Sequence, residues 1–254
     1  AVVATINDQN YQGTNSATLV ITKANPTIVV TPYSATYNAA AHTAANSATG
    51  VLGETLSGLD VSGTIHTNAG DYPNDAWVFT DVTGNYNNAS SSIHDTIAVA
   101  PLTITATSTG KLYGDALTFA GNEFTPTGLA GSDTVTSLTL DCTGATSTAT
   151  VAGSPYDIIP SLAIGSGLSN YNITYVNGSL TVNKRPVTVT AEPKTKIIGA
   201  PADPALTYNI TGGSLANADV FTGALTRAAG ETLGIYAITQ GTLALDVNNY
   251  TLTY

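Results

Sequence analysis

The sequence feature that most constrains the fold is an internal repeat. The pair Asn-Tyr occurs four times, at intervals of 75 to 85 residues, with Tyr11, Tyr86, Tyr171 and Tyr250 as its tyrosines. Other landmarks keep a fixed order around it: a proline that opens an alternating run, a small-residue turn that carries an acid, and a Gly-x-Tyr or Gly-Ser-Pro-Tyr motif. The tyrosines of this last motif are Tyr72, Tyr156 and Tyr236. Such order indicates copies of one structural unit.

The landmarks divide the chain into three repeats and a leading fragment. We call residues 25–100 the first repeat, 101–184 the second repeat and 185–254 the third repeat. Residues 1–24 are expected to be the C-terminal fragment of a preceding repeat. After its Asn-Tyr pair the second repeat continues into a final strand-like run, which the third repeat lacks. We therefore expect the chain to be a piece of a longer polypeptide.

Alternation of threonine with aliphatic residues predicts β-strands. It is clear at 102–106, 179–182 and 187–191, and clusters of Gly, Asn and Ser separate the runs as in β-sandwiches. Single helical turns are expected only near 133–137 and 216–221. The predicted fold is all-β, with tandem immunoglobulin-like β-sandwich repeats. Short proline-containing linkers favour their arrangement as a rod.

The recurring aromatic and amide residues have two interpretations. The tyrosines could pack partly buried, with the hydroxyl reaching a backbone group at a sheet corner, or could form aromatic platforms for sugar. Their recurrence at fold landmarks favours the structural interpretation. The Asn of each Asn-Tyr pair is expected at a turn or in the left-handed conformation. Trp77 is expected to be the core aromatic residue of the first repeat.

The third repeat, from PVTVTAEP to NNYTLTY, resembles the bacterial MBG-type repeat. The second repeat fits the same pattern with Tyr113-Gly114-Asp115 and GLAGSD, and the first repeat fits a related variant. The third repeat departs from it at Ile198-Gly199-Ala200, where Tyr-Gly-Asp is usual. The resemblance implies an all-β stalk module of the kind found in tandem in very large secreted and cell-surface proteins, many of them adhesin-like. It implies no catalytic residues.

Charge and composition exclude several classes of protein. There are 17 acidic and 7 basic residues, for a net charge of -10, so the chain is not a binder of nucleic-acid phosphates. A single cysteine, Cys142, excludes a disulfide framework. We interpret Cys142 as a small apolar residue in a strand. No apolar run is long enough to span a bilayer, so we expect no membrane insertion in this segment.

No motif indicates an enzyme or a cofactor. The chain has no nucleophile elbow, phosphate-binding loop or dinucleotide fingerprint. His42, His66 and His94 lack the spacing of metal ligands. If the chain binds an ion, calcium suits the acids near turns and repeat ends best. Those acids are Asp60, Asp81, Asp115, Asp203 and Asp246.

These observations predict a structural segment of an extracellular repeat protein. It would be a stalk or filament that spaces or links at a cell surface, with neighbouring repeats or copies of itself as partners. The alternative is an adhesin module that binds a cell-surface glycan or protein.

The unequal ends suggest strand exchange between copies. A sandwich that lacks its last strand exposes sheet edges and part of its core. A strand is expected over residues 16–23, and its apolar part aligns with the run missing from the third repeat; it consists of Ala17, Thr18, Leu19, Val20 and Ile21. We therefore expect residues 16–24 of one copy to add to residues 185–254 of the next. The alternative is a chain simply cut from a longer one.

Overall fold

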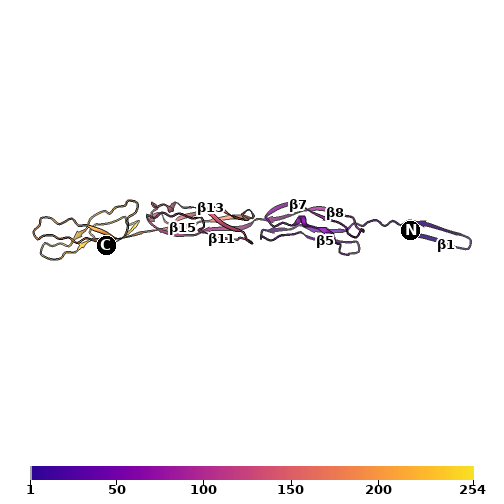
Figure 1. The fold of residues 1–254 in the computed structure, drawn as a ribbon, viewed down its shortest axis with the longest axis horizontal. Helices are drawn as coiled ribbons and strands as arrows, with labels where there is room; N and C mark the ends of the chain where they lie inside the picture. Colours follow the sequence, from indigo (N-terminus) through magenta and orange to yellow (C-terminus); the bar gives the residue numbers. More distant parts are fainter. Residues whose placement is uncertain (1) are drawn as a thin grey trace. The chain divides into compact units, whose positions relative to one another are not determined.

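The computed structural model describes residues 2–254, which form β-strands joined by turns and loops (Figure 1). Within this range there is no α-helix, and helical geometry is confined to short 3-10 turns. These turns are η1 (Ser62–Thr64), η2 (Thr143–Ala145), η3 (Val151–Gly153) and η4 (Leu168–Asn170). The predicted all-β class is confirmed.

Internal contacts divide the chain into two compact units. The first unit extends to Ala100 and also includes the segments Ala130–Ser132 and Ser169–Tyr171. The second unit contains the rest of the second repeat and all of the third. Each sheet among the described residues takes its strands from one repeat or from the leading fragment. The repeat boundaries given above stay a prediction.

The leading fragment forms a β-hairpin. β1 (Val2–Asn7) pairs antiparallel with β2 (Gln12–Ala17), with Val2 opposite Ala17. The strand predicted over residues 16–23 is wrong beyond Ala17, because Thr18–Lys23 has no strand geometry. A strand needs a neighbour that takes up its backbone hydrogen bonds, and no described residue pairs with this segment.

The first repeat contains a sheet of order β4-β8-β7-β6 and the pair β3-β5. Its strands are β3 (Thr27–Thr31), β4 (Ser34–Thr36), β5 (Ala45–Thr49), β6 (Leu59–Asp60), β7 (Gly70–Phe79) and β8 (Ala89–Ala98). Phe79 is fully buried, with Ala48 and Tyr86 beside it, whereas Trp77 is only half-buried against this cluster. Trp77 thus packs on the core, but the fully buried aromatic residue is Phe79. The two residues lie on the same inward face of β7, because they are two positions apart.

The second repeat contains two sheets, of order β10-β15-β13-β12 and β11-β9-β14. Its strands are β9 (Ala100–Ala106), β10 (Thr109–Leu112), β11 (Phe124–Thr127), β12 (Thr134–Asp141), β13 (Tyr156–Ser166), β14 (Tyr171–Val176) and β15 (Gly178–Asn183). The strands predicted at 102–106 and 179–182 are confirmed. The helical turn predicted at 133–137 is wrong, because β12 occupies this segment. Cys142 is buried immediately after β12.

The third repeat contains the sheet β17-β16-β20 and the pair β18-β19. Its strands are β16 (Arg185–Ala191), β17 (Tyr208–Gly213), β18 (Thr226–Arg227), β19 (Ile238–Thr239) and β20 (Tyr250–Thr253). The strand predicted at 187–191 is confirmed. The helical turn predicted at 216–221 is wrong, because Asn217 and Ala218 have φ values of 51° and 61°, in the left-handed region.

One hydrophobic cluster joins the second and third repeats inside the second unit. It contains Tyr113 and Val182 from the second repeat and Val187, Leu243 and Tyr250 from the third. Val187 and Val189 are almost fully buried, while the threonine between them is only half-buried. Period-two alternation therefore directs the aliphatic side chains of β16 into this cluster.

Candidate functional site: the repeat ends

In the three repeats, the tyrosines of the Asn-Tyr pairs are buried and bond to a backbone amide. In the first repeat, the Val51 N–H donates to the Tyr86 hydroxyl at 3.2 Å. In the second repeat, the Ala130 N–H donates to the Tyr171 hydroxyl at 2.8 Å. In the third repeat, the Ala216 N–H donates to the Tyr250 hydroxyl at 2.9 Å, and the ring of Tyr250 is buried. Each tyrosine therefore fixes a turn from a distant part of its repeat.

The turn that each tyrosine reaches is the acidic landmark of the sequence. The acid lies three residues after the bonded amide in each repeat, at Glu54, Asp133 and Asp219. The Tyr250 hydroxyl donates to Asp219 Oδ2 at 2.8 Å, and the Tyr86 hydroxyl donates to Glu54. The hydrogen bond from Tyr86 lowers the pKa of Glu54, and burial raises the pKa of Tyr250. Two landmarks that are distant in sequence thus meet in one hydrogen-bonded contact between a tyrosine and an acidic turn, which we call the latch.

The tyrosines of the Gly-x-Tyr landmarks are half-buried and bond to the chain just before them. The Tyr72 hydroxyl donates to the Asn68 carbonyl at 2.8 Å, and Tyr156 donates to the Thr150 carbonyl at 3.0 Å. Tyr236 donates to the Thr232 carbonyl at 2.8 Å. Each of these tyrosines therefore closes a corner of the chain just before it.

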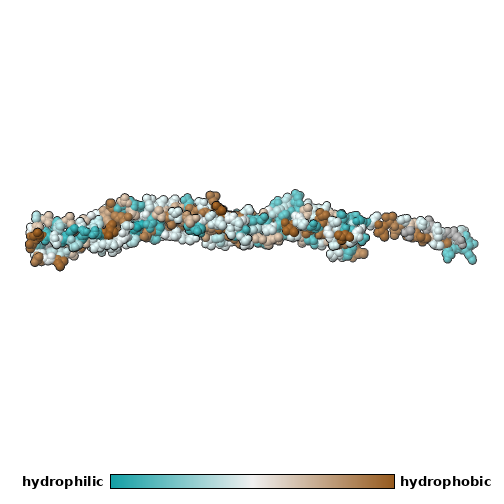
Figure 2. Space-filling model, viewed as in Figure 1, coloured by the Kyte–Doolittle hydropathy of each residue, from teal (hydrophilic) through white to brown (hydrophobic). Residues whose placement is uncertain are grey.

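The remaining candidate residues lie in the leading fragment and are exposed. The exposed fraction of Tyr11 is 72%, in the turn between β1 and β2. Ala17 ends β2, and the segment Thr18–Ile21 follows it as exposed chain without strand geometry. Figure 2 shows brown, hydrophobic side chains on the segment after the hairpin.

In the first unit, the Asn-Tyr pair of the second repeat packs on the end of the first repeat. The rings of Tyr37 and Tyr171 meet edge to face, with centroids 5.4 Å apart and an interplanar angle of 83°. Asn170 is buried, and its Oδ1 accepts a hydrogen bond from the Ala69 N–H at 2.9 Å. Both residues of the pair therefore contact the preceding repeat.

In the second unit, the Asn-Tyr pair of the third repeat makes the same contacts. The rings of Tyr113 and Tyr250 have centroids 5.4 Å apart and an interplanar angle of 79°. Asn249 is buried, and its Oδ1 accepts from the Val151 N–H at 3.1 Å. Arg185, at the start of the third repeat, donates from Nε to the Tyr113 carbonyl at 2.6 Å. Tyr113 is the tyrosine of the Tyr-Gly-Asp motif, so that motif is part of the junction.

The asparagine therefore has a role that sequence reasoning missed. The turn expected at Asn249 is confirmed, but the left-handed alternative is wrong, because Asn85, Asn170 and Asn249 are not among the described residues with positive φ. The side chain instead satisfies an amide of the preceding repeat. The recurrence of Asn before Tyr was the available signal for this role.

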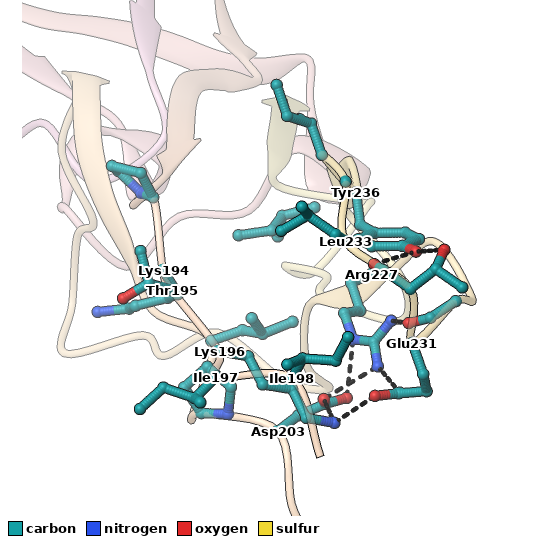
Figure 3. Close-up of a pocket in the computed structure, with 18 of the residues that line it drawn as sticks. Lys194, Thr195, Lys196, Ile197, Ile198, Asp203, Arg227, Glu231, Leu233 and Tyr236 are labelled. Carbon is teal, nitrogen blue, oxygen red and sulfur yellow. Dashed lines mark hydrogen bonds and ion pairs between the residues drawn. The ribbon is translucent and has the colours of Figure 1, made fainter. Parts of the chain in front are cut away.

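At the end of the third repeat, the junction residues are uncovered. Ile198 lies as many residues after the start of β16 as Tyr113 lies after the start of β9, so the two residues correspond. Each is followed by a glycine with positive φ: Gly199 at 81° and Gly114 at 87°. The exposed fraction of Ile198 is 69%. A groove of about 620 Å³ lies between the segment 194–198 and the chain around Leu233 and Tyr236 (Figure 3). Figure 2 shows hydrophobic surface over this part of the third repeat.

A four-residue ion-pair network closes one end of the groove (Figure 3). Lys196 Nζ lies 2.9 Å from Asp203 Oδ1 and 2.8 Å from Glu231 Oε2. Arg227 bonds to the same two acids, with Nε 2.9 Å from Asp203 Oδ2. The hydrogen bonds from Arg227 and Lys196 lower the pKa of Asp203 to about 2. The network therefore links the loops on the two sides of the groove.

The acids proposed as calcium ligands all have partners in the chain. Asp60 and Asp81 accept from backbone amides of their own turns, Asp246 accepts from the Asn248 N–H, and Asp115 pairs with Arg185. Asp203 belongs to the network just described. Within residues 2–254, no group of three His, Cys, Asp or Glu side chains is arranged to hold a metal ion.

The three histidines contact polar residues of the first repeat. His42 Nε2 lies 3.2 Å from Asn38 Oδ1, and His94 pairs with Asp71. His66 Nε2 lies 2.8 Å from Asp75 Oδ2. Each histidine ring thus bonds to one Asn or Asp side chain, and the rings of His42 and His66 also pack on Tyr33 and Tyr72.

Asp95 is a buried acid that sequence reasoning did not identify. It is fully buried, and its Oδ1 accepts from the Tyr33 N–H at 2.8 Å. Burial raises the pKa of its carboxyl group, and the nearby Asp75 acts in the same direction. Its place in the alternating strand β8 marks an inward position, but the pattern there predicts an aliphatic residue. The corresponding residue of the second repeat is Leu180.

Comparison with known proteins agrees with the repeat pattern. The family model described as MBG domain (YGX type) matches residues 102–181 and 187–254, and the model described as MBG domain matches residues 1–25. No curated protein and no solved structure was found to match. None of the described residues belongs to a helix that could cross a membrane. The YGX-type matches alone cover more than half of the sequence, so the chain belongs to the MBG domain family.

Proposed function

We propose that this chain is a structural spacer of an extracellular or cell-surface protein. In this proposal each repeat is an immunoglobulin-like β-sandwich, and successive repeats are held end to end as a stiff rod that sets a distance. Membership of the MBG domain family indicates a repeat module of a surface protein. The role of spacer is the additional step that we infer.

The observation that carries the proposal is the recurrence of one junction from the motif residues themselves. In both units an Asn side chain accepts from an amide of the preceding repeat, and a Tyr ring packs edge to face on an aromatic ring of that repeat. An edge-to-face pair contributes about 0.5–1.5 kcal/mol beyond the area that it buries. Residues that recur in order to join neighbours fit a spacer better than an independent binding module.

The tyrosines give little support to the adhesin alternative. A sugar platform needs an exposed ring, but the rings of six landmark tyrosines are buried or half-buried, and their hydroxyls bond to the chain. Tyr11 is the exposed member of the set. We therefore favour a structural and non-catalytic role, with neighbouring repeats as partners.

Small-angle X-ray scattering of the full chain tests the proposal. A stiff spacer predicts the scattering of one extended, rigid particle. The double variant Asn170→Ala, Asn249→Ala removes the amide contact at both junctions and should give the larger spread of dimensions of a flexible chain. Tyr11→Ala is the matched control and should leave the scattering unchanged. Flexible scattering from the unmodified chain would contradict the proposal.

A further inference from the structure

The first repeat contains two acids in its interior, on neighbouring strands. Asp75 of β7 is buried, and Asp95 of β8 is fully buried. Asp95 Oδ1 accepts from the Tyr33 N–H at 2.8 Å, but Oδ2 is buried and accepts no hydrogen bond from any residue between 2 and 254. The carboxyl group of Asp75 lies within hydrogen-bonding reach of Asp95. Two ionised carboxylates only accept hydrogen bonds, so a bond between them requires a proton.

The surroundings of this acid pair provide little positive charge. Residues 25–100 contain no Lys or Arg, and the basic group at the pair is His66, whose Nε2 lies 2.8 Å from Asp75 Oδ2. The other titratable groups that face Asp95 are two tyrosines, Tyr72 opposite it on β7 and Tyr33 between β3 and β4. Burial raises the pKa of Tyr33 to about 12, so its hydroxyl stays neutral. One histidine balances one carboxylate, which favours a neutral second carboxyl group.

The second repeat has aliphatic residues in place of both acids. The register of β7 with β8 and of β13 with β15 places Ile158 at the position of Asp75 and Leu180 at the position of Asp95. Ile158 and Leu180 are fully buried. Apolar side chains therefore fill the same place in a folded repeat, so the repeat fold itself does not require the acid pair.

A series of contacts leads from the acid pair to the junction with the second repeat. The ring of His66, which Asp75 binds, stacks on the ring of Tyr72, with centroids 3.6 Å apart and an interplanar angle of 3°. The Tyr72 hydroxyl donates to the Asn68 carbonyl at 2.8 Å. Asn68 Oδ1 accepts from Asn170 Nδ2 at 3.4 Å, and Asn170 is the residue that joins the two repeats. Tyr72 thus connects the loop that contacts the second repeat with the histidine that Asp75 binds.

We propose that a proton shared by Asp75 and Asp95 controls how firmly the first repeat binds the second. With the proton bound, the Asp95 carboxyl group donates to Asp75, and Asp75 holds His66 and the loop before β7 in place. When the proton passes to water, two carboxylates face each other in the interior, and their repulsion displaces Asp75 and His66. The inference rests on the proposed function, because it makes the stiffness of the spacer depend on pH.

The direction of the pH dependence follows from the pKa of Asp95. Burial, together with the hydrogen bond to Asp75, raises this pKa above its ordinary value of 3.8 in the folded chain. The proton therefore stabilises the folded first repeat fully at pH values below 3.8, and this contribution is lost as the pH rises through the raised pKa. The junction between the first and second repeats is thus expected to be stiffer in acid and looser at higher pH.

Infrared titration of the full chain detects the proton directly. We expect one carboxyl group to stay protonated at pH values at which exposed carboxyl groups have ionised, and we expect Asp95→Asn to lose this signal. Asp71→Asn is the matched control, because Asp71 is an exposed acid of β7 that also pairs with a histidine, His94. Absence of the signal from the unmodified chain, or its presence in Asp95→Asn, would overturn the inference.

A distance distribution measures the effect on the junction. Spin labels at the exposed residues Ser91 and Thr125, in a Cys142→Ala background, would be measured by double electron–electron resonance. We expect a narrow distribution in acid that broadens as the pH rises to mildly alkaline values. Asp95→Asn should lose the broadening, because its amide donates to Asp75 as the protonated acid does.

A second variant keeps the test independent of one substitution. Asp75→Asn supplies an amide that donates to Asp95 without a proton, so it should also lose the broadening, whereas Asp71→Asn should retain it. Broadening that persists in both Asp95→Asn and Asp75→Asn would overturn the inference, and so would a width that does not change with pH in the unmodified chain. If that constant width is narrow, the spacer proposal stays in place; if it is broad, the spacer proposal fails as well.

Discussion

At the scale of single residues, the landmarks are the groups that fix one part of the chain to another. Tyr250 has both roles: its hydroxyl bonds to the Ala216 N–H and to Asp219, and its ring packs on Tyr113 of the preceding repeat. Asn249 joins the two repeats through the Val151 N–H. The same side chains therefore stabilise the repeat and the junction, which explains why the pair recurs as a unit.

Replacing Tyr250 by Phe tests the latch. The substitution keeps the ring but leaves the Ala216 N–H without its acceptor, while Asp219 keeps the Tyr113 hydroxyl as a donor. The lost hydrogen bonds of these partly buried groups cost about 1 kcal/mol. We expect the free energy of unfolding of the third repeat, measured by urea titration with hydrogen exchange of its peptides, to fall by this amount. Tyr11→Phe should have no effect. Equal stability of the two variants would show that the hydroxyl bonds contribute nothing.

The glycine of the corner landmark provides a test of close packing. A Cβ atom added at Gly153 would overlap the Tyr156 hydroxyl, so Gly153→Ala must displace that tyrosine. The matched control is Gly234→Ala, where the nearest atom of Tyr236 is 3.8 Å away. We expect Gly153→Ala to lower the melting temperature of its repeat and Gly234→Ala to leave the melting temperature unchanged. The opposite order would contradict the corner geometry.

At the scale of strands and loops, the third repeat has fewer paired strands than the second. β15 fills the space between β10 and β13, whereas the corresponding space in the third repeat is a groove between 194–198 and Tyr236. Lys111, opposite Val182 of β15 in the same sheet, is buried, and burial lowers its pKa. Its counterpart Lys196 instead bonds to Asp203 and Glu231. Ion pairs thus connect the loops on the two sides of this groove.

This network makes the third repeat sensitive to acid. The pKa of Asp203 is about 2 in the folded chain, below its ordinary value of 3.8. Its ion pairs therefore stabilise the folded chain fully at pH values above 3.8. That contribution is lost as the pH falls toward 2. We expect the melting temperature of the third repeat to decrease over this range, as measured by calorimetry. Asp203→Asn should show a smaller decrease, and identical pH profiles would exclude a role for the network.

The sequence predicts which segments are strands better than it predicts which segments pair with them. The strands at 102–106 and 187–191 follow from alternation alone, because period two identifies the buried face. The same alternation predicts a strand through Leu19 and Ile21, which is absent because a strand also needs a neighbour. The Asn170 contact could not be predicted, because a motif does not show which distant amide it reaches. Repeat landmarks therefore identify important residues before they identify their contacts.

At the scale of the whole molecule, neighbouring repeats are joined by their own motif residues. One hydrophobic cluster runs from the second repeat into the third, so the junction shares a core as well as polar contacts. Stability in linear arrays is approximately a sum of unit and interface contributions. An interface with Tyr113 on one side and Tyr250 on the other can thus be copied without redesign of the unit.

The most direct test of this account is a distance distribution across the boundary between the second and third repeats. Spin labels at the exposed residues Thr125 and Thr211, in a Cys142→Ala background, would be measured by double electron–electron resonance. We expect one narrow distribution, and a broad one after Tyr113→Ala with Asn249→Ala removes the ring pair and the amide contact. A broad distribution in the chain with an intact junction would contradict the claim that the motif residues hold the repeats end to end.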